Sequence, residues 1–195
     1  MYASDLQGCK VYLLPPSEKR TKKDGTPRDP KKLGKIHFPV FTHDGMRAVG
    51  YMVKLPDVVG MIKRPDRFIA LDAIDVYEGV IVVKDQKDTF DQAAAKRLGV
   101  NLDECLIWTG MDVRTVSGKP AGYCSDAQFS PRTGRVSTFT LSGGTAASVL
   151  VGNVEMPASY LKGYRGGAMI VSDDIADLQL SGGAAAKAAE VSVVV

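Results

Sequence analysis

The chain has 195 residues, a length that suits one large domain or two small ones. Apolar residues make up 45% and charged residues 24%, values that exclude a disordered chain and predict a hydrophobic core. No apolar run of about 18 residues occurs, which excludes a membrane-spanning helix. The net charge is only +3, but residues 18–35 alone carry +5, from eight basic and three acidic residues, so the remainder carries −2.

The cysteines indicate a reducing compartment. Cys9, Cys105 and Cys124 are odd in number, and no two have the spacing of a metal site. The first residues do not form a basic start followed by an apolar run, so no secretory signal is expected. Free thiols in a cytoplasmic protein are the interpretation that follows.

The N-terminal third begins with a predicted strand at 10–14, which ends at Pro15-Pro16. Residues 17–33 have almost no apolar side chains and predict a solvated basic loop. This loop is either a linker or a contact for an acidic partner, RNA or an anionic membrane surface. It contains no aromatic residue, so it does not indicate base stacking. The candidate nucleic-acid contacts are Lys19, Arg20, Lys22, Lys23, Lys31 and Lys32.

The next segment alternates apolar and polar residues, as half-buried strands do. Strands are predicted at 35–41 and 49–55 around an Asp44-Gly45 hairpin turn, then at 68–71 and 80–83. Residues 56–67 fit neither a strand nor a helix period, and they combine apolar and basic side chains. They either pack over one end of the fold or form an exposed docking surface. The candidate partner-binding residues there are Met61, Ile62, Lys63, Arg64 and Arg67.

A helix is predicted over 88–98, with Thr89 and Gln92 as a capping box and Gly99 as the terminating residue. It separates two β regions and is interpreted as a connector. Beyond it, strands are predicted at 122–129, 136–141, 149–151, 154–156 and 168–171, with a turn at 130–134. Trp108 stands at the entry to this second region and is either a packing residue or an exposed anchor for a partner.

The two β regions resemble each other. Residues 45–51 (GMRAVGY) match 118–123 (GKPAGY), and residues 77–83 (YEGVIVV) match 165–171 (RGGAMIV). Each half runs from a glycine turn into a strand and finishes with another glycine turn and an apolar strand. One supersecondary unit used twice explains this pattern.

The second region resembles the PRC-barrel family. The resemblance rests on Gly118, Gly122, Asp126, Phe129, Pro131 and Gly134-Arg135-Val136, followed by Val154, Met156-Pro157, Gly167 and Ile170-Val171. PRC-barrels occur in a photosynthetic reaction-centre subunit, in a ribosome-maturation factor that docks on a ribosomal protein, and as stand-alone bacterial and archaeal proteins.

The resemblance implies a mostly β fold of two small PRC-type β-barrels packed together and joined by one short α-helix. The expected divisions are an N-terminal strand and basic loop (1–33), a first barrel (34–86), a helical connector (87–106), a second barrel (107–176) and an alanine-rich tail (177–195). It also implies a non-catalytic protein-binding or assembly module, with a homodimer left open. The alternative is an RNA- or ribosome-associated factor that acts through residues 18–35.

The search for catalytic chemistry yields no site. His37 and His43 are the only histidines, and neither belongs to a nucleophile motif. A metal site needs three or four converging ligands, which the sequence does not provide. We therefore expect no enzyme activity, no metal and no cofactor.

Overall fold

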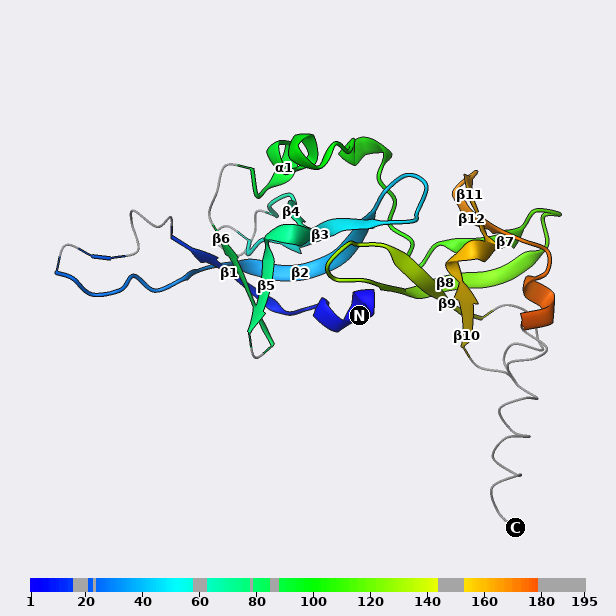
Figure 1. The fold of residues 1–195 in the computed structure, drawn as a ribbon, viewed down its shortest axis with the longest axis horizontal. Coiled ribbons are helices and arrows are strands. Elements are labelled where there is room, and N and C mark those ends of the chain that lie inside the picture. Colours follow the sequence, from blue (N-terminus) through cyan, green and yellow to red (C-terminus); the bar gives the residue numbers. More distant parts are fainter. Residues whose placement is uncertain are drawn as a thin grey trace, which may run out of the picture.

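The structure is a computed structural model that describes residues 1–15, 21–22, 24–57, 63–77, 79–84, 88–143 and 153–178. It is mostly β and contains two six-stranded sheets (Figure 1). Their strand orders are β4-β3-β2-β1-β6-β5 and β10-β9-β8-β7-β12-β11. No helix among the described residues has the length and apolar character needed to cross a bilayer.

Each sheet is built from consecutive strands of the chain. The first sheet contains β1 (Lys10–Leu14), β2 (Lys31–Phe41), β3 (Ala48–Lys54), β4 (Arg67–Ala70), β5 (Ile74–Tyr77) and β6 (Val80–Lys84). The second contains β7 (Asp112–Thr115), β8 (Pro120–Phe129), β9 (Val136–Ser142), β10 (Val154–Pro157), β11 (Leu161–Arg165) and β12 (Ala168–Val171).

The two sheets are one topology used twice. In each sheet, the strand that comes first in the chain pairs in parallel with the strand that comes last, β1 with β6 and β7 with β12. All other pairs of the described strands are antiparallel. The sequence match of 77–83 to 165–171 agrees with this correspondence. The match of 45–51 to 118–123 is wrong, because residues 45–51 lead into β3, whose counterpart is β9, whereas 118–123 lead into β8.

Each sheet is strongly curled. Strands β4 and β5 are opposite edges of the first sheet, yet only the turn Leu71–Ala73 joins them. Six flat strands would separate these edges by about 24 Å, while the backbone from Ala70 to Ile74 spans at most about 15 Å. The turn Ala158–Tyr160 links β10 to β11 in the same way. Among the described residues no pairing joins these edges, so each sheet remains open there.

Several element boundaries differ from the prediction. The first sheet includes β1, so it extends beyond residues 34–86, and β2 begins at Lys31, inside the predicted basic loop. Pairing with β1 overrides the polar composition of that segment. Strands β5 and β11 were not predicted, because most of their residues are polar or exposed. The predicted strand at 149–151 and the tail from 179 onward lie outside the described residues.

The predicted helix forms as α1 (Asp91–Leu98), and Gly99 ends it in the left-handed conformation. The predicted capping box is wrong, because Phe90 occupies the N-cap and Thr89 Oγ1 instead donates to the carbonyl of Lys84 at 3.1 Å. The residues before α1 cover the β4 edge, where Ala70 N donates to the carbonyl of Thr89 at 3.3 Å. The helix therefore shields one edge of the first sheet.

The two units meet around a pseudo-two-fold axis. Ala48 N donates to the carbonyl of Gly134 at 2.8 Å, and Val136 N donates to the carbonyl of Met46 at 2.9 Å. These bonds are counterparts, since Ala48 starts β3 and Val136 starts β9. The last residues of β2 and β8, Phe41 and Phe129, pack edge to face with ring centroids 6.3 Å apart.

The larger of the two hydrophobic clusters of the described residues extends through both units. It includes Tyr51 and Ile81 of the first sheet and Phe139 and Met169 of the second. Trp108 lies in this core with no exposed surface and packs against Phe139. The core is therefore shared, and each unit completes its burial against the other.

Gly45 sets how closely the β2–β3 turn approaches Trp108. Its φ is +70°, and a Cβ at this position would lie 2.2 Å from an indole carbon. We expect Gly45→Ala to lower the free energy of unfolding by about 2–5 kcal/mol, from left-handed strain together with overpacking. Denaturant unfolding measures the change.

The control is Gly118→Ala. Gly118 also has a positive φ, +85°, but nothing lies within 4 Å of the added carbon. It should lose only about 1 kcal/mol from strain. Equal losses at the two positions would show that contact with Trp108 does not limit the turn.

Candidate functional site

A continuous cross-strand row crosses the first sheet. Tyr77 of β5 pairs with Val80 of β6, Val80 with Lys10 of β1, Lys10 with Lys35 of β2, and Lys35 with Lys54 of β3. Directly paired residues share a face of the sheet. All except Val80, which is half-buried, are exposed. We call Lys10, Lys35 and Lys54 the lysine row.

Strand alternation points the lysine row outward. The neighbouring residues Val11, Ile36 and Val53 are buried in the core, and successive side chains of a strand face opposite sides. Gly34 brings β2 and β3 close together, because a Cβ there would lie 2.2 Å from the carbonyl oxygen of Lys54. Three neighbouring strands therefore hold their ammonium groups side by side.

The lysine row has no charge partner among the described residues. The ion pairs of the described residues all lie away from the row. His37 pairs with Asp66, Arg67 with Asp91, and Arg97 with Asp72 and Asp88. Lys32, Lys35 and Lys54 border a depression of about 220 Å³, and Asp57 is the one acidic residue among its described lining residues. Like charges directly opposite one another destabilise a sheet. The row therefore repels itself unless an outside anion binds.

The second unit shows that the fold does not require these lysines. In the equivalent row, Arg165 pairs with Ala168, Ala168 with Asp112, Asp112 with Tyr123, and Tyr123 with Ser142. Asp112, Tyr123 and Ser142 thus take the places of Lys10, Lys35 and Lys54. The same strand pairing forms with an acid, an aromatic and a hydroxyl, so the topology does not require lysine at these positions.

A basic arm adjoins the lysine row, and we define it as the β1–β2 connection together with Lys31 and Lys32 at the start of β2. The β1–β2 connection covers 15–30, whereas its counterpart between β7 and β8 covers only 116–119. Figure 1 shows the blue β1–β2 hairpin projecting from the first sheet. The described basic residues Lys22, Arg28, Lys31 and Lys32 are all exposed there. The expected contacts Lys19, Arg20 and Lys23 lie outside the described residues.

The described tip of the arm forms a turn. Lys22 N donates to the carbonyl of Thr26 at 2.7 Å, and Asp24 accepts from Thr26 N at 3.0 Å and Thr26 Oγ1 at 2.6 Å. These hydrogen bonds lower the pKa of Asp24. The carboxylate is thus held by its own turn.

The apolar-basic segment is described only in part. Met61 and Ile62 lie outside the described residues, while Lys63 and Arg64 are exposed. Arg67 is occupied, because its Nε donates to Asp91 at 2.9 Å and its guanidinium lies 4.3 Å from the ring centre of Phe90. Arg67 therefore fastens α1 to β4 and is not free to anchor a partner.

Trp108 is a packing residue. Of the two roles expected for it, a packing residue or an exposed anchor, its complete burial fits the first and leaves no surface for a partner. Its Nε1 has no hydrogen-bond acceptor among the described residues.

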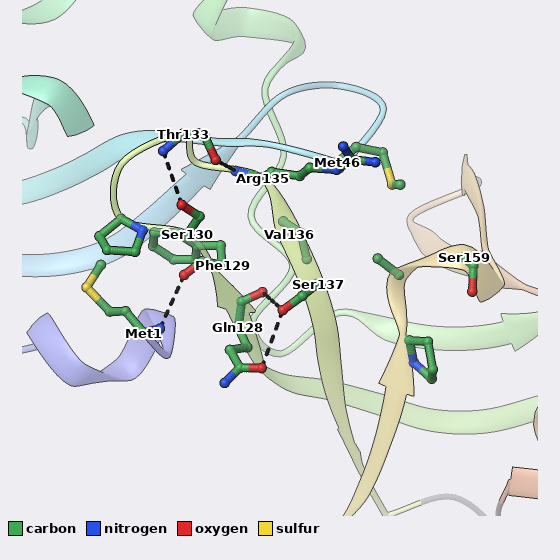
Figure 2. Close-up of a pocket in the computed structure, with 13 residues that line it drawn as sticks. Met1, Met46, Gln128, Phe129, Ser130, Thr133, Arg135, Val136, Ser137 and Ser159 are labelled. Atoms are coloured by element: carbon green, nitrogen blue, oxygen red, sulfur yellow. Dashed lines mark hydrogen bonds between the residues drawn. The ribbon is translucent and has the colours of Figure 1, made fainter.

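The junction of the units contains an open groove of about 720 Å³. Figure 2 shows residues of the β8–β9 hairpin in the middle of its lining, with Met1 on one side and Ser159 on the other. Its polar groups satisfy one another: Met1 N donates to the Phe129 carbonyl at 3.2 Å, and Ser137 Oγ donates to the Gln128 carbonyl at 3.2 Å. Of the described lining residues, Arg135 alone has an ionisable side chain.

A second groove of about 860 Å³ brings His43 and Asp44 near Cys105 and Tyr164. Burial raises the pKa of the Cys105 thiol. His37 lies elsewhere, with its Nδ1 2.5 Å from Asp66 Oδ2. Within the part of the chain that the structure describes, no three His, Cys, Asp or Glu side chains are grouped so as to hold a metal ion.

Neutralising the centre of the lysine row should stabilise the fold. We expect Lys35→Gln to raise the free energy of unfolding by about 0.5 kcal/mol at low salt, because it removes repulsion from both Lys10 and Lys54. The gain should shrink in about 1 M salt, which screens the charges. Urea unfolding at two salt concentrations measures it, with Lys162→Gln as the control on β11. A loss of stability at low salt would mean that the row is not under repulsion.

Comparison with known proteins gives no match: no protein-family model matches the chain, and no curated protein does. The PRC-barrel resemblance therefore remains a prediction from the motifs that carry it.

Proposed function

We propose that the protein is a non-catalytic binding and assembly module that docks an anionic partner on the lysine row and the adjoining arm. The observation that carries this proposal is the asymmetry between two units of one topology. The first unit keeps three mutually repelling lysines where the second has Asp112, Tyr123 and Ser142. Proteins accept such a cost to stability where a surface has a function.

The chemistry of the described grooves supports a non-catalytic role. Thiols need a lowered pKa to act as nucleophiles. Burial instead raises the pKa of Cys124 to about 12, and it also raises that of Cys105. Among its described lining residues, the junction groove offers hydroxyls and an arginine, and no side chain that could act as a base. Binding is the activity that these surfaces support best.

We infer that each curled sheet is a small barrel of the PRC type, with the gap between β4 and β5, or β10 and β11, as its open side. The short turns Leu71–Ala73 and Ala158–Tyr160 support this inference, because they hold opposite sheet edges near each other. In this arrangement the outer faces of the barrels are the surfaces that meet partners.

An RNA- or ribosome-associated role is the second candidate. It is favoured by the continuity between the row and the basic arm, since Lys32 of the arm's returning strand lines the same depression as Lys35 and Lys54. Lys32 and Lys35 belong to the predicted basic segment, and the fold places them beside Lys54, which is distant from them in the sequence.

Photo-crosslinking in cells tests the docking surface. A photoreactive phenylalanine derivative replaces Tyr77, which ends the row of the first unit, or Tyr123, which lies in the equivalent row of the second. Both side chains are exposed, at 66% and 44%. We expect adducts mainly from position 77, and at least a tenfold reduction when Lys10, Lys35 and Lys54 are changed to serine.

Equal crosslinking at 77 and 123 would contradict the proposal, as would adducts at 77 that survive the three lysine substitutions. Circular dichroism of each variant checks that the fold is retained.

A further inference from the structure

We infer that the lysine row binds the phosphate backbone of single-stranded RNA, and that Tyr77 provides a surface on which a base stacks. This inference rests on the proposed function, because it specifies the anion that docks on the same face. The observation behind it is the placement of an exposed aromatic ring and three unpaired ammonium groups in one cross-strand row of the described residues.

Tyr77 lies at the open edge of the row. It belongs to the edge strand β5, and 66% of its surface is exposed, the largest value among the exposed large hydrophobic residues described. An exposed ring beside a cationic track is how proteins bind single strands without sequence preference, since every base has a face that stacks. The basic arm alone contains no aromatic residue. The sheet brings Tyr77 to lysines that are distant from it in the sequence.

Tyr12 adds a second ring in the next row. It pairs with Lys32 on one side and with Val82 on the other, and Val82 pairs with Asp75. Tyr12 is half-buried between its neighbours. Two adjacent rows of the same face thus contain four lysines and two tyrosines.

The exposed ring favours a nucleic acid over an acidic polypeptide. All three charges of the row are lysines, which bind phosphate and carboxylate alike as compact point charges with rotatable donors. The lysines therefore require an anion without choosing between the two. An acidic peptide would gain little from an exposed tyrosine, whereas every base of a nucleic acid has a face that stacks on one. The row together with Tyr77 therefore fits a phosphodiester chain better than an acidic polypeptide.

The acidic groups on this face are few in the described residues. Asp75 ends the second row, and Asp57 borders the depression beside Lys54. Neither forms an ion pair with the lysine row, and Asp24 in the arm is held by Thr26. An approaching backbone thus meets net positive charge from Lys54 to the arm. Extended single strands in cells are mainly RNA, which makes RNA the expected occupant.

Fluorescence anisotropy with the full chain and a labelled 12-nucleotide oligouridine tests the inference. We expect K10S/K35S/K54S to weaken binding at least tenfold at about 50 mM salt. The slope of log affinity against log salt should also fall by about 2, since each lost phosphate contact contributes about 0.7 for a single strand. Y77A should weaken binding about tenfold with the slope unchanged, because stacking is not ionic.

The matched control is R114S/K119S/K162S, which removes three exposed positive charges from the second unit. It makes the same change in net charge and should leave the affinity within twofold. If this control loses as much affinity as the row variant, binding reflects net charge alone and the inference is overturned. Circular dichroism confirms that each variant folds.

Parallel titrations separate the failure of this inference from failure of the proposed function. If polyglutamate or phosphatidylglycerol vesicles bind through the three lysines and oligouridine does not, the RNA inference is wrong while an anionic partner remains. If oligothymidine binds through the lysines and Tyr77 but oligouridine does not, RNA is likewise wrong. If no anion depends on Lys10, Lys35 and Lys54, both the inference and the proposed function are wrong.

Discussion

The hydrogen bonds that join the starts of β3 and β9 fix the rest of the molecule. The paired contacts of Ala48 with Gly134 and of Met46 with Val136 place two small curled sheets against each other. Each unit alone has little interior to bury, and small domains are marginal for that reason. The shared core, to which Phe41, Phe129 and Trp108 belong, solves this problem. It buries apolar side chains of both units at the junction, whereas the proposed docking surface lies on an outward face of the first sheet.

Duplication gives this protein an internal reference for its own surface. Because the two units share strand order and cross-strand pairing, each paired position of the first sheet has a counterpart in a similar backbone. Differences between counterparts cannot be demands of the topology. Lys35 against Tyr123 is one such difference, and the long arm against a short turn is another. Such differences distinguish the residues that the fold requires from the features that only one unit has.

Part of this arrangement could be predicted from the sequence. Lys35 and Lys54 are almost equally distant from the Asp44-Gly45 turn, so a hairpin folded there pairs them, as the structure shows. Lys10 could not be added to the row, because the connection at 15–30 leaves the β1–β2 register open and the pairing is irregular. Tyr77 belongs to the row only because β6 pairs in parallel with β1, and no local sequence pattern specifies that pairing. The mostly β fold class was therefore predictable, whereas the site depends on long-range register.

The parallel pairing between the first and last strands of each unit has a consequence for synthesis on the ribosome. Strand β1 finds its parallel partner only once β6 has been made, and the turn Ala3–Leu6 also waits for β8, because Ser4 hydrogen-bonds to Asp126. The earliest residues of the chain thus lack part of their native contacts until β8 has been made. Such non-local pairing slows folding. Until β6 emerges, the nascent first sheet also leaves one edge of β1 unpaired, a stage at which a chaperone would find it.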